Sequence, residues 1–276
     1  MTVRPAALAG TFYPADGDAL RRVVESHVGR SGVEPAAGTV AALVVPHAGY
    51  AYSGATAGCG YARVRGKRPG RIVLLGCSHR HRFPGVSLWP EGGYATPLGV
   101  APVDEAFTAR LAAVFGTTPP EPHGEENALE TQVPFLQCLF AGTPMVPVLF
   151  GEGADEWHTE FGRTLAGMID ADDLVIASTD LSHYLTEEAA NEMDGVTLDA
   201  LLSGEPALLL GRLRRERNGM CGGAAVAAAV ACAAARGAGR GMLLEYATSA
   251  RAGGGTGRVV GYAAVSFEVY NAEARP

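Results

Sequence analysis

The sequence predicts an α/β protein built in three layers, with helices on both faces of a mostly parallel or mixed central sheet. Short apolar runs of strand length alternate with segments long enough to form helices. The apolar runs are continuous, which is typical of strands that helices cover on both faces. We find no internal repeat and no linker long enough to separate domains, so we expect one domain over residues 1–276.

The predicted elements alternate along most of the chain. The predicted strands are TVAALVVP (39–46), RIVLLG (71–76), PMVPVLFG (144–151) and DLVIAST (173–179). The predicted helices cover 55–64, 103–114, 126–139, 156–170, 187–202 and 223–236. Two late strand-like runs, 241–250 and 258–270, flank a Gly-rich loop and indicate a hairpin or a flexible flap.

Composition excludes several classes of partner. The formal net charge of −7 argues against nucleic-acid binding, which needs a basic face. No run approaches the roughly 20 apolar residues of a membrane span, and the first residues contain Pro and Gly where a secretory signal needs a continuous apolar core. We therefore expect a cytoplasmic location. The five cysteines form no CxxC pair, which argues against a disulfide framework.

Three of the seven histidines directly follow predicted strands: His47, His79 and His183. Because the carboxyl ends of parallel strands meet at one edge of a sheet, these side chains can share a crevice. Each histidine alone could be a structural residue, but the three together favour a functional cluster. Two imidazoles need at least one further donor to hold a metal ion.

Cys221 is a candidate for that donor, since it lies where a Gly-rich turn meets an Ala-rich helix. A helix N-terminus favours a thiolate. The alternative is that Cys221 is a small residue in a tight turn. Cys77 can also be interpreted either way, whereas the other three cysteines fit helix or core positions.

Eight motifs, in this order and spacing, resemble those of the Memo family, whose bacterial and archaeal members are called AmmeMemoRadiSam system protein B. They are AGTFYP (9–14), PHAGYAYSG (46–54), LLGCSHR (74–80), YATPLGVAPVD (94–104), EENALETQVPFLQ (125–137), VPVLFG (146–151), STDLSHY (178–184) and MCGG (220–223). That family is similar in fold to the class III extradiol dioxygenases, the LigB-like non-haem Fe(II) enzymes.

The resemblance implies a metal set of His47, His79 and Cys221, with His183 in the same pocket as an acid/base and Asp180 beside it. In the dioxygenases an acidic ligand takes the place of Cys221. A thiolate is a softer donor that suits iron or copper. Many members also have a His where this chain has Asn127. Glu126 and Glu130, four residues apart, are interpreted either as a solvated pair or as pocket residues.

These observations lead to two functional hypotheses. The first is an oxidoreductase that uses Fe(II), with copper or zinc as alternative ions and an unknown substrate. The second is a non-catalytic binding or scaffold protein that uses the same pocket for a peptide or a small molecule. A zinc hydrolase is a weaker third interpretation. The bacterial family name implies a pathway link to an AMME-domain protein and a radical-SAM enzyme.

Overall fold

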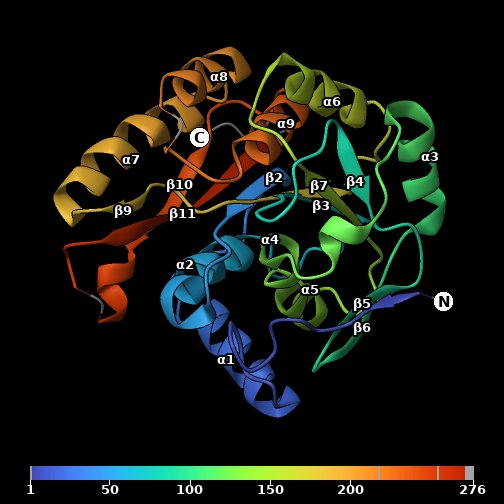
Figure 1. Cartoon of the computed structure of the whole chain (residues 1–276), viewed down its shortest axis with the longest axis horizontal. Coiled ribbons are helices and arrows are strands. Elements are labelled where there is room, and N and C mark those ends of the chain that lie inside the picture. Colours follow the sequence, from blue (N-terminus) through green and yellow to red (C-terminus); the bar gives the residue numbers. More distant parts are fainter. Residues whose placement is uncertain (1, 217, 254, 271–276) are drawn as a thin grey trace.

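The computed structural model describes residues 2–216, 218–253 and 255–270. Its centre is a mixed eight-stranded sheet in which seven strands follow the order β10–β11–β2–β8–β3–β7–β4 and β9 pairs with β11 (Figure 1). Strands β2, β8, β3 and β7 are parallel, and the outer strands are antiparallel. The strands are β2 (Thr39–Val45), β3 (Ile72–Cys77), β4 (Val86–Leu88), β7 (Met145–Phe150), β8 (Leu174–Ser178), β9 (His183–Leu185), β10 (Met242–Thr248) and β11 (Val259–Val269).

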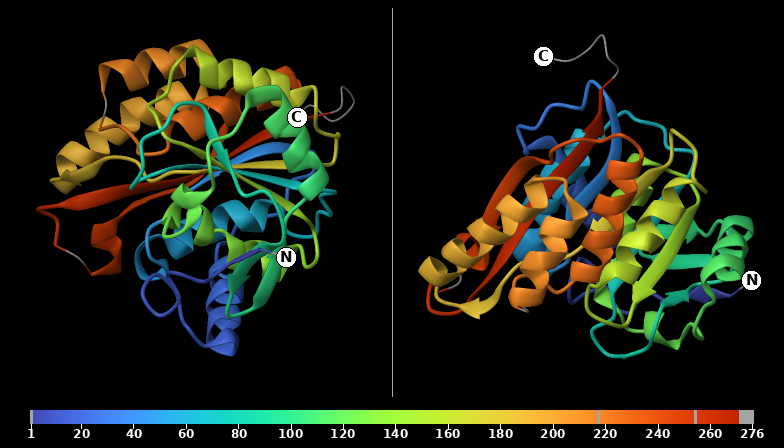
Figure 2. Two further views of the ribbon diagram at one scale, coloured as in Figure 1. Left: turned by 45° about the vertical axis from the view of Figure 1, so that its right-hand side comes forward. Right: turned by 90° about the horizontal axis from the view of Figure 1, so that it is seen from above.

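Helices cover both faces of this sheet, as Figures 1 and 2 show. One face carries α6 (Glu156–Ala166), α7 (Glu187–Leu202), α8 (Pro206–Arg215) and α9 (Gly223–Ala235). The other carries α1 (Gly17–Gly29), α2 (Tyr50–Arg63), α4 (Asn127–Glu130) and α5 (Val133–Leu139). Successive residues of β2 alternate between two apolar cores: Val44 packs into the core with α9, and Val45 into the core with α1 and α2. The predicted three-layer architecture is confirmed.

A second, three-stranded sheet lies beside the α1–α5 layer. It consists of β1 (Val3–Arg4), β5 (Gly93–Thr96) and β6 (Gly99–Pro102) in the order β1–β5–β6. Helix α3 (Glu105–Phe115) follows β6, and two short 3-10 helices complete the elements at Glu121–His123 and Ser249–Ala252. The sequence patterns did not predict this small sheet, because its strands are only two to four residues long.

Several predicted boundaries differ from the structure. The predicted helix 126–139 is two helices, because Pro134 lacks an amide hydrogen and its ring would clash with the carbonyl of Glu130, where α4 ends. Helix α2 begins at Tyr50, five residues before the predicted start. The late hairpin is confirmed by the antiparallel pairing of β10 with β11, although residue 254 of its loop lies outside the described residues. Within the described residues, none of the helices combines the length and apolar character that crossing a membrane requires.

Candidate metal centre

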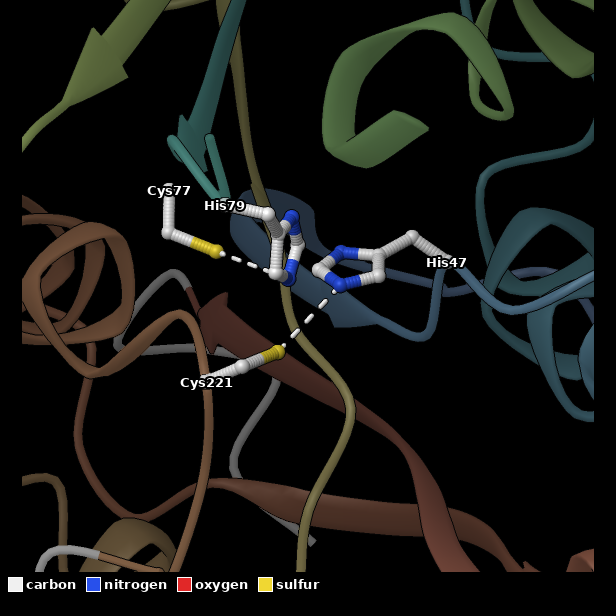
Figure 3. A group of neighbouring side chains, drawn as sticks. All are labelled: His47, Cys77, His79 and Cys221. Atoms are coloured by element: carbon white, nitrogen blue, oxygen red, sulfur yellow. Dashed lines mark hydrogen bonds between the residues drawn. The ribbon is translucent and has the colours of Figure 1, made fainter. Parts of the chain in front are cut away.

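A group of four side chains lies at the carboxyl edge of three adjacent parallel strands. His47 follows β2, Cys77 ends β3, and His79 lies two residues further along the chain. Between β2 and β3 runs β8, which leads into the loop that contains Asp180. Cys221 comes from the loop before α9, and its backbone amide donates to the Asp180 carbonyl at 3.2 Å. The fold therefore brings together side chains that are as far as 174 positions apart in the sequence (Figure 3).

The four side chains fit around one metal ion. One potential ligand atom from each of His47, Cys77, His79 and Cys221 lies within 4.8 Å of every other. The Cys221 Sγ is 3.2 Å from His47 Nε2, and the Cys77 Sγ is 3.6 Å from His79 Nε2. Metal–nitrogen bonds of about 2.0 Å and metal–sulfur bonds of about 2.3 Å place tetrahedral donors about 3.3–3.8 Å apart. Only small side-chain movements separate the four donors from such a site.

Hydrogen bonds orient the His47 ring. Its Nδ1 lies 3.0 Å from the Ser178 hydroxyl, which also accepts from Gln132 Nε2 at 2.9 Å. A hydroxyl has two acceptor lone pairs, so Ser178 can accept both hydrogens. With Ser178 as the acceptor, Nδ1 carries a proton, and Nε2 faces the Cys221 Sγ at 3.2 Å. The His47 backbone amide also donates to Asp180 Oδ1 at 2.8 Å.

A buried carboxylate orients the second ring. Glu126 is only 2% exposed and accepts from both the backbone amide and the Nδ1 of His79, each at 2.7 Å. It also accepts from the Ala128 amide at 2.9 Å. The carboxylate has no hydrogen to donate, so His79 carries its proton on Nδ1 and presents Nε2 to the group. This carboxylate–histidine pair is typical of metal centres, where it fixes the ligand ring.

The electrostatics of the group favour one thiolate and two protonated imidazoles while no cation is bound. The Cys77 thiol donates to Cys221 and, with the two imidazoles, holds the pKa of Cys221 well below its usual value against the effect of burial. The same hydrogen bond and burial raise the pKa of Cys77. Burial is the largest single effect and lowers the pKa of His47 and His79, but it is outweighed by the combined effects of Cys221 and Asp180 on His47 and of Cys221 and Glu126 on His79. Their pKa values rise to about 9 and about 10.

A cavity of about 720 Å³ gives access to the group from solvent. Cys77, His79 and Cys221 line it, together with the side chains of Arg80 and Arg82, whereas His47 lies behind them. His79 is 35% exposed and His47 only 1%. A molecule in this cavity would therefore meet the two sulfur atoms and His79 before it met His47.

Asp180 adjoins the group, since its backbone amide donates to the Cys221 Sγ at 3.3 Å. His183 begins β9 and is not one of the four grouped side chains, and in the described part of the chain its ring makes no hydrogen bond. Asp180 is 5% exposed and faces His47, with Oδ2 at 4.0 Å from His47 Nε2. Asp180 thus contacts the His47 imidazole and backbone. A catalytic role for His183 and Asp180 stays a prediction.

Other residues that the sequence left open now have clear positions. Glu126 and Glu130 are both buried, so the solvated-pair interpretation is wrong. Glu126 holds His79, whereas Glu130 accepts from the Leu8 amide and pairs with Arg4. Asn127 Nδ2 donates to the His47 carbonyl at 3.4 Å, which links the first residue of α4 to the loop that follows β2.

His123 and His81 also lie outside the group. His123 is buried against Tyr94, and its Nε2 donates to the Ser87 carbonyl at 3.0 Å. His81 is exposed on the cavity rim. Cys77 is the member of the group whose role sequence reasoning left undecided. The signal that could have identified it is its spacing, because residues two apart in an extended segment point the same way, and His79 is two residues later.

Comparisons with known proteins identify the family of this chain and support its fold. The family model described as Memo-like protein matches residues 4–266. A MEMO1 family protein of Ignicoccus hospitalis is 34% identical over 290 residues, covering 97% of this chain and 99% of the relative. One of Methanopyrus kandleri is 32% identical, covering 96% and 98%. The solved structure of an uncharacterized Escherichia coli K12 protein aligns with a TM-score of 0.53 at 17% identity, covering 82% of this chain and 98% of that one, and supports the fold alone.

Proposed function

This chain belongs to the Memo family, and we propose that it is a metal-binding protein whose ion is held by His47, His79 and Cys221. The observation that carries the proposal is the convergence of these donors within 4.8 Å of one another from three separate parts of the chain. Imidazole and thiolate are both ligands for iron, copper and zinc. Ser178 and Glu126 support the proposal further, because they leave the Nε2 atoms of both rings facing the same point.

We propose further that the site serves a redox reaction, with Fe(II) as the first candidate ion and copper as the second. Such an ion supplies one-electron chemistry when bound. The chain's own residues would hold the rings in place, keep a thiolate at Cys221 and admit a small molecule through the cavity beside Arg80 and Arg82. His183, three residues after Asp180 in the chain, would donate or accept a proton.

Metal content tests the first part of this proposal. Wild type and a Cys221→Ala variant are reconstituted anaerobically with Fe(II), desalted and measured by elemental analysis. Wild type should retain about one ion per chain, and Cys221→Ala should lose most of it, since the variant removes one of the proposed ligands. Cys138→Ala, which changes a half-buried thiol on α5, is the matched control and should behave as wild type. Equal retention by all three proteins would remove Cys221 from the ligand set.

Oxygen uptake tests the second part. With catechols, thiols or ascorbate as reductants, the iron-loaded protein should consume oxygen well above an equal amount of free iron. Uptake no faster than that of free iron, in protein shown to retain its ion, would contradict the redox proposal. It would favour the alternative of a binding protein that uses the same cavity for a peptide or a small molecule.

A further inference from the structure

We propose that Cys77 is a fourth ligand of the same ion, so that the resting site holds two imidazoles and two thiolates and opens only when Cys77 is displaced. This inference rests on the proposed metal-binding function. It goes beyond that function because it changes the coordination of the site, from three ligands with an open position to four ligands with none. It also assigns a specific role to a cysteine that sequence patterns alone leave undecided.

The backbone places Cys77 toward the group for the same reason that it places His79 there. β3 ends at Cys77, and its extended pairing with β7 continues at Ser78, whose amide donates to the Phe150 carbonyl at 2.8 Å. In an extended segment the side chains of Cys77 and His79 lie on the same side. The Cys77 side chain is buried, at 8% exposed, and its Sγ contacts His79 Nε2 at 3.6 Å.

The positions of the other three donors define where a fourth ligand belongs. His47, His79 and Cys221 leave one corner of a tetrahedron empty, and the Cys77 Sγ lies within 4.8 Å of each of their ligand atoms. Figure 3 shows the four side chains converging, with the two sulfur atoms on the same side of the group. Cys77 and Cys221 both line the 720 Å³ cavity, whereas His47 does not. Cys77 therefore occupies the corner that a molecule entering from the cavity would otherwise take.

A second thiolate has chemical consequences for the site. Two imidazoles and two thiolates in a tetrahedron are typical of closed sites, which bind Zn²⁺ firmly and keep no position for water or substrate. A site with only the other three ligands would bind an added anion directly. Cys77 is thus a specificity-determining residue, because it controls both the preferred ion and the access of exogenous ligands.

X-ray absorption at the metal edge counts the sulfur ligands directly. The full chain is loaded with one equivalent of Zn²⁺, and the first coordination shell is measured in wild type and in Cys77→Ser. Wild type should show two sulfur atoms at about 2.3 Å and two nitrogen atoms at about 2.0 Å. Cys77→Ser should show one sulfur atom, and the control Cys138→Ser should match wild type. One sulfur atom in the wild type would overturn the inference, whether or not the variant folds.

Cobalt provides a second measurement of the same point. The thiolate-to-metal absorption of the Co²⁺-loaded protein should fall to about half in Cys77→Ala, since one of two thiolates is lost. Added azide should change the cobalt spectrum of Cys77→Ala and leave that of wild type unchanged. Equal azide sensitivity in both proteins would contradict a closed site.

These outcomes separate the two proposals. A wild-type chain that binds one ion through a single sulfur atom refutes the role of Cys77 and leaves the proposed metal binding in place. A wild-type chain that binds neither Zn²⁺, Co²⁺ nor Fe²⁺ refutes both.

Discussion

Replacing Glu126 with Gln should weaken metal binding about 10- to 100-fold, the usual effect of removing the partner of a ligating histidine. The reason is the hydrogen-bond pattern around the carboxylate. Oε1 accepts from His79 Nδ1 and the Ala128 amide, and Oε2 accepts from the His79 amide. A Gln amide has only one oxygen, so in either orientation its NH₂ group must face one of these donors.

When the NH₂ group faces His79 Nδ1, the ring relieves this contact by moving its proton from Nδ1 to Nε2. The ring then presents a hydrogen, instead of a lone pair, to the metal position. A loss of 10- to 100-fold corresponds to about 1.4–2.7 kcal/mol of binding free energy.

The assay is competition between the protein and a chromogenic zinc chelator, at a pH where both variants are folded by circular dichroism. Glu125→Gln is the matched control, because the neighbouring Glu125 side chain is 70% exposed and pairs with Arg80 on the surface. The control should bind zinc as wild type does. If Glu126→Gln binds zinc within twofold of wild type, Glu126 does not set the protonation state of His79 and the reasoning is wrong.

Three further perturbations test other contacts. Glu130→Gln should destabilise the fold by about 3–5 kcal/mol, because it leaves the buried Arg4 without its ion-pair partner; urea denaturation measures this, and a loss below about 1 kcal/mol would contradict it. Gly222→Ala should lower metal retention, since a Cβ there would lie 2.5 Å from the Ser178 carbonyl oxygen and would push the Cys221 loop away; wild-type retention would show that the loop adapts. His123 has a pKa lowered by burial to about 3, so the unfolded chain binds more protons between about pH 3 and 6.5 and stability falls on acidification through that window. From pH 7 to pH 5 wild type should lose about 2 kcal/mol more stability than His123→Gln, so equal pH dependence of the two proteins would refute it.

The sequence predicts those residues of the site that directly follow a strand. His47 and His79 follow continuous apolar runs, and such runs become the central parallel strands β2 and β3. Their proximity was less obvious, because β8 is inserted between these two strands although it comes about a hundred residues later in the chain. No local pattern reports which strand pairs with which.

Cys221 and Glu126 show why the remaining site residues were harder to identify. Cys221 reaches the group through a loop that bonds to the Asp180 carbonyl, a contact between residues 41 positions apart. Sequence physics left it open, and the family resemblance identified it. Glu126 looked like one of a pair on a single helix, but it is the N-cap residue of a four-residue helix that ends before Pro134. The break turns Glu126 toward His79 and Glu130 toward the N-terminal segment.

The most direct test of the proposed metal site is an anomalous-scattering map from crystals of the purified chain. The crystals are grown without added chelator, and data are recorded on both sides of the iron, copper and zinc absorption edges. The proposed four-ligand site predicts one strong peak between His47 Nε2, His79 Nε2 and the sulfur atoms of Cys77 and Cys221, about 2.0–2.3 Å from its ligands. No peak at this position, even after the crystals are soaked in each of the three metals, would contradict it.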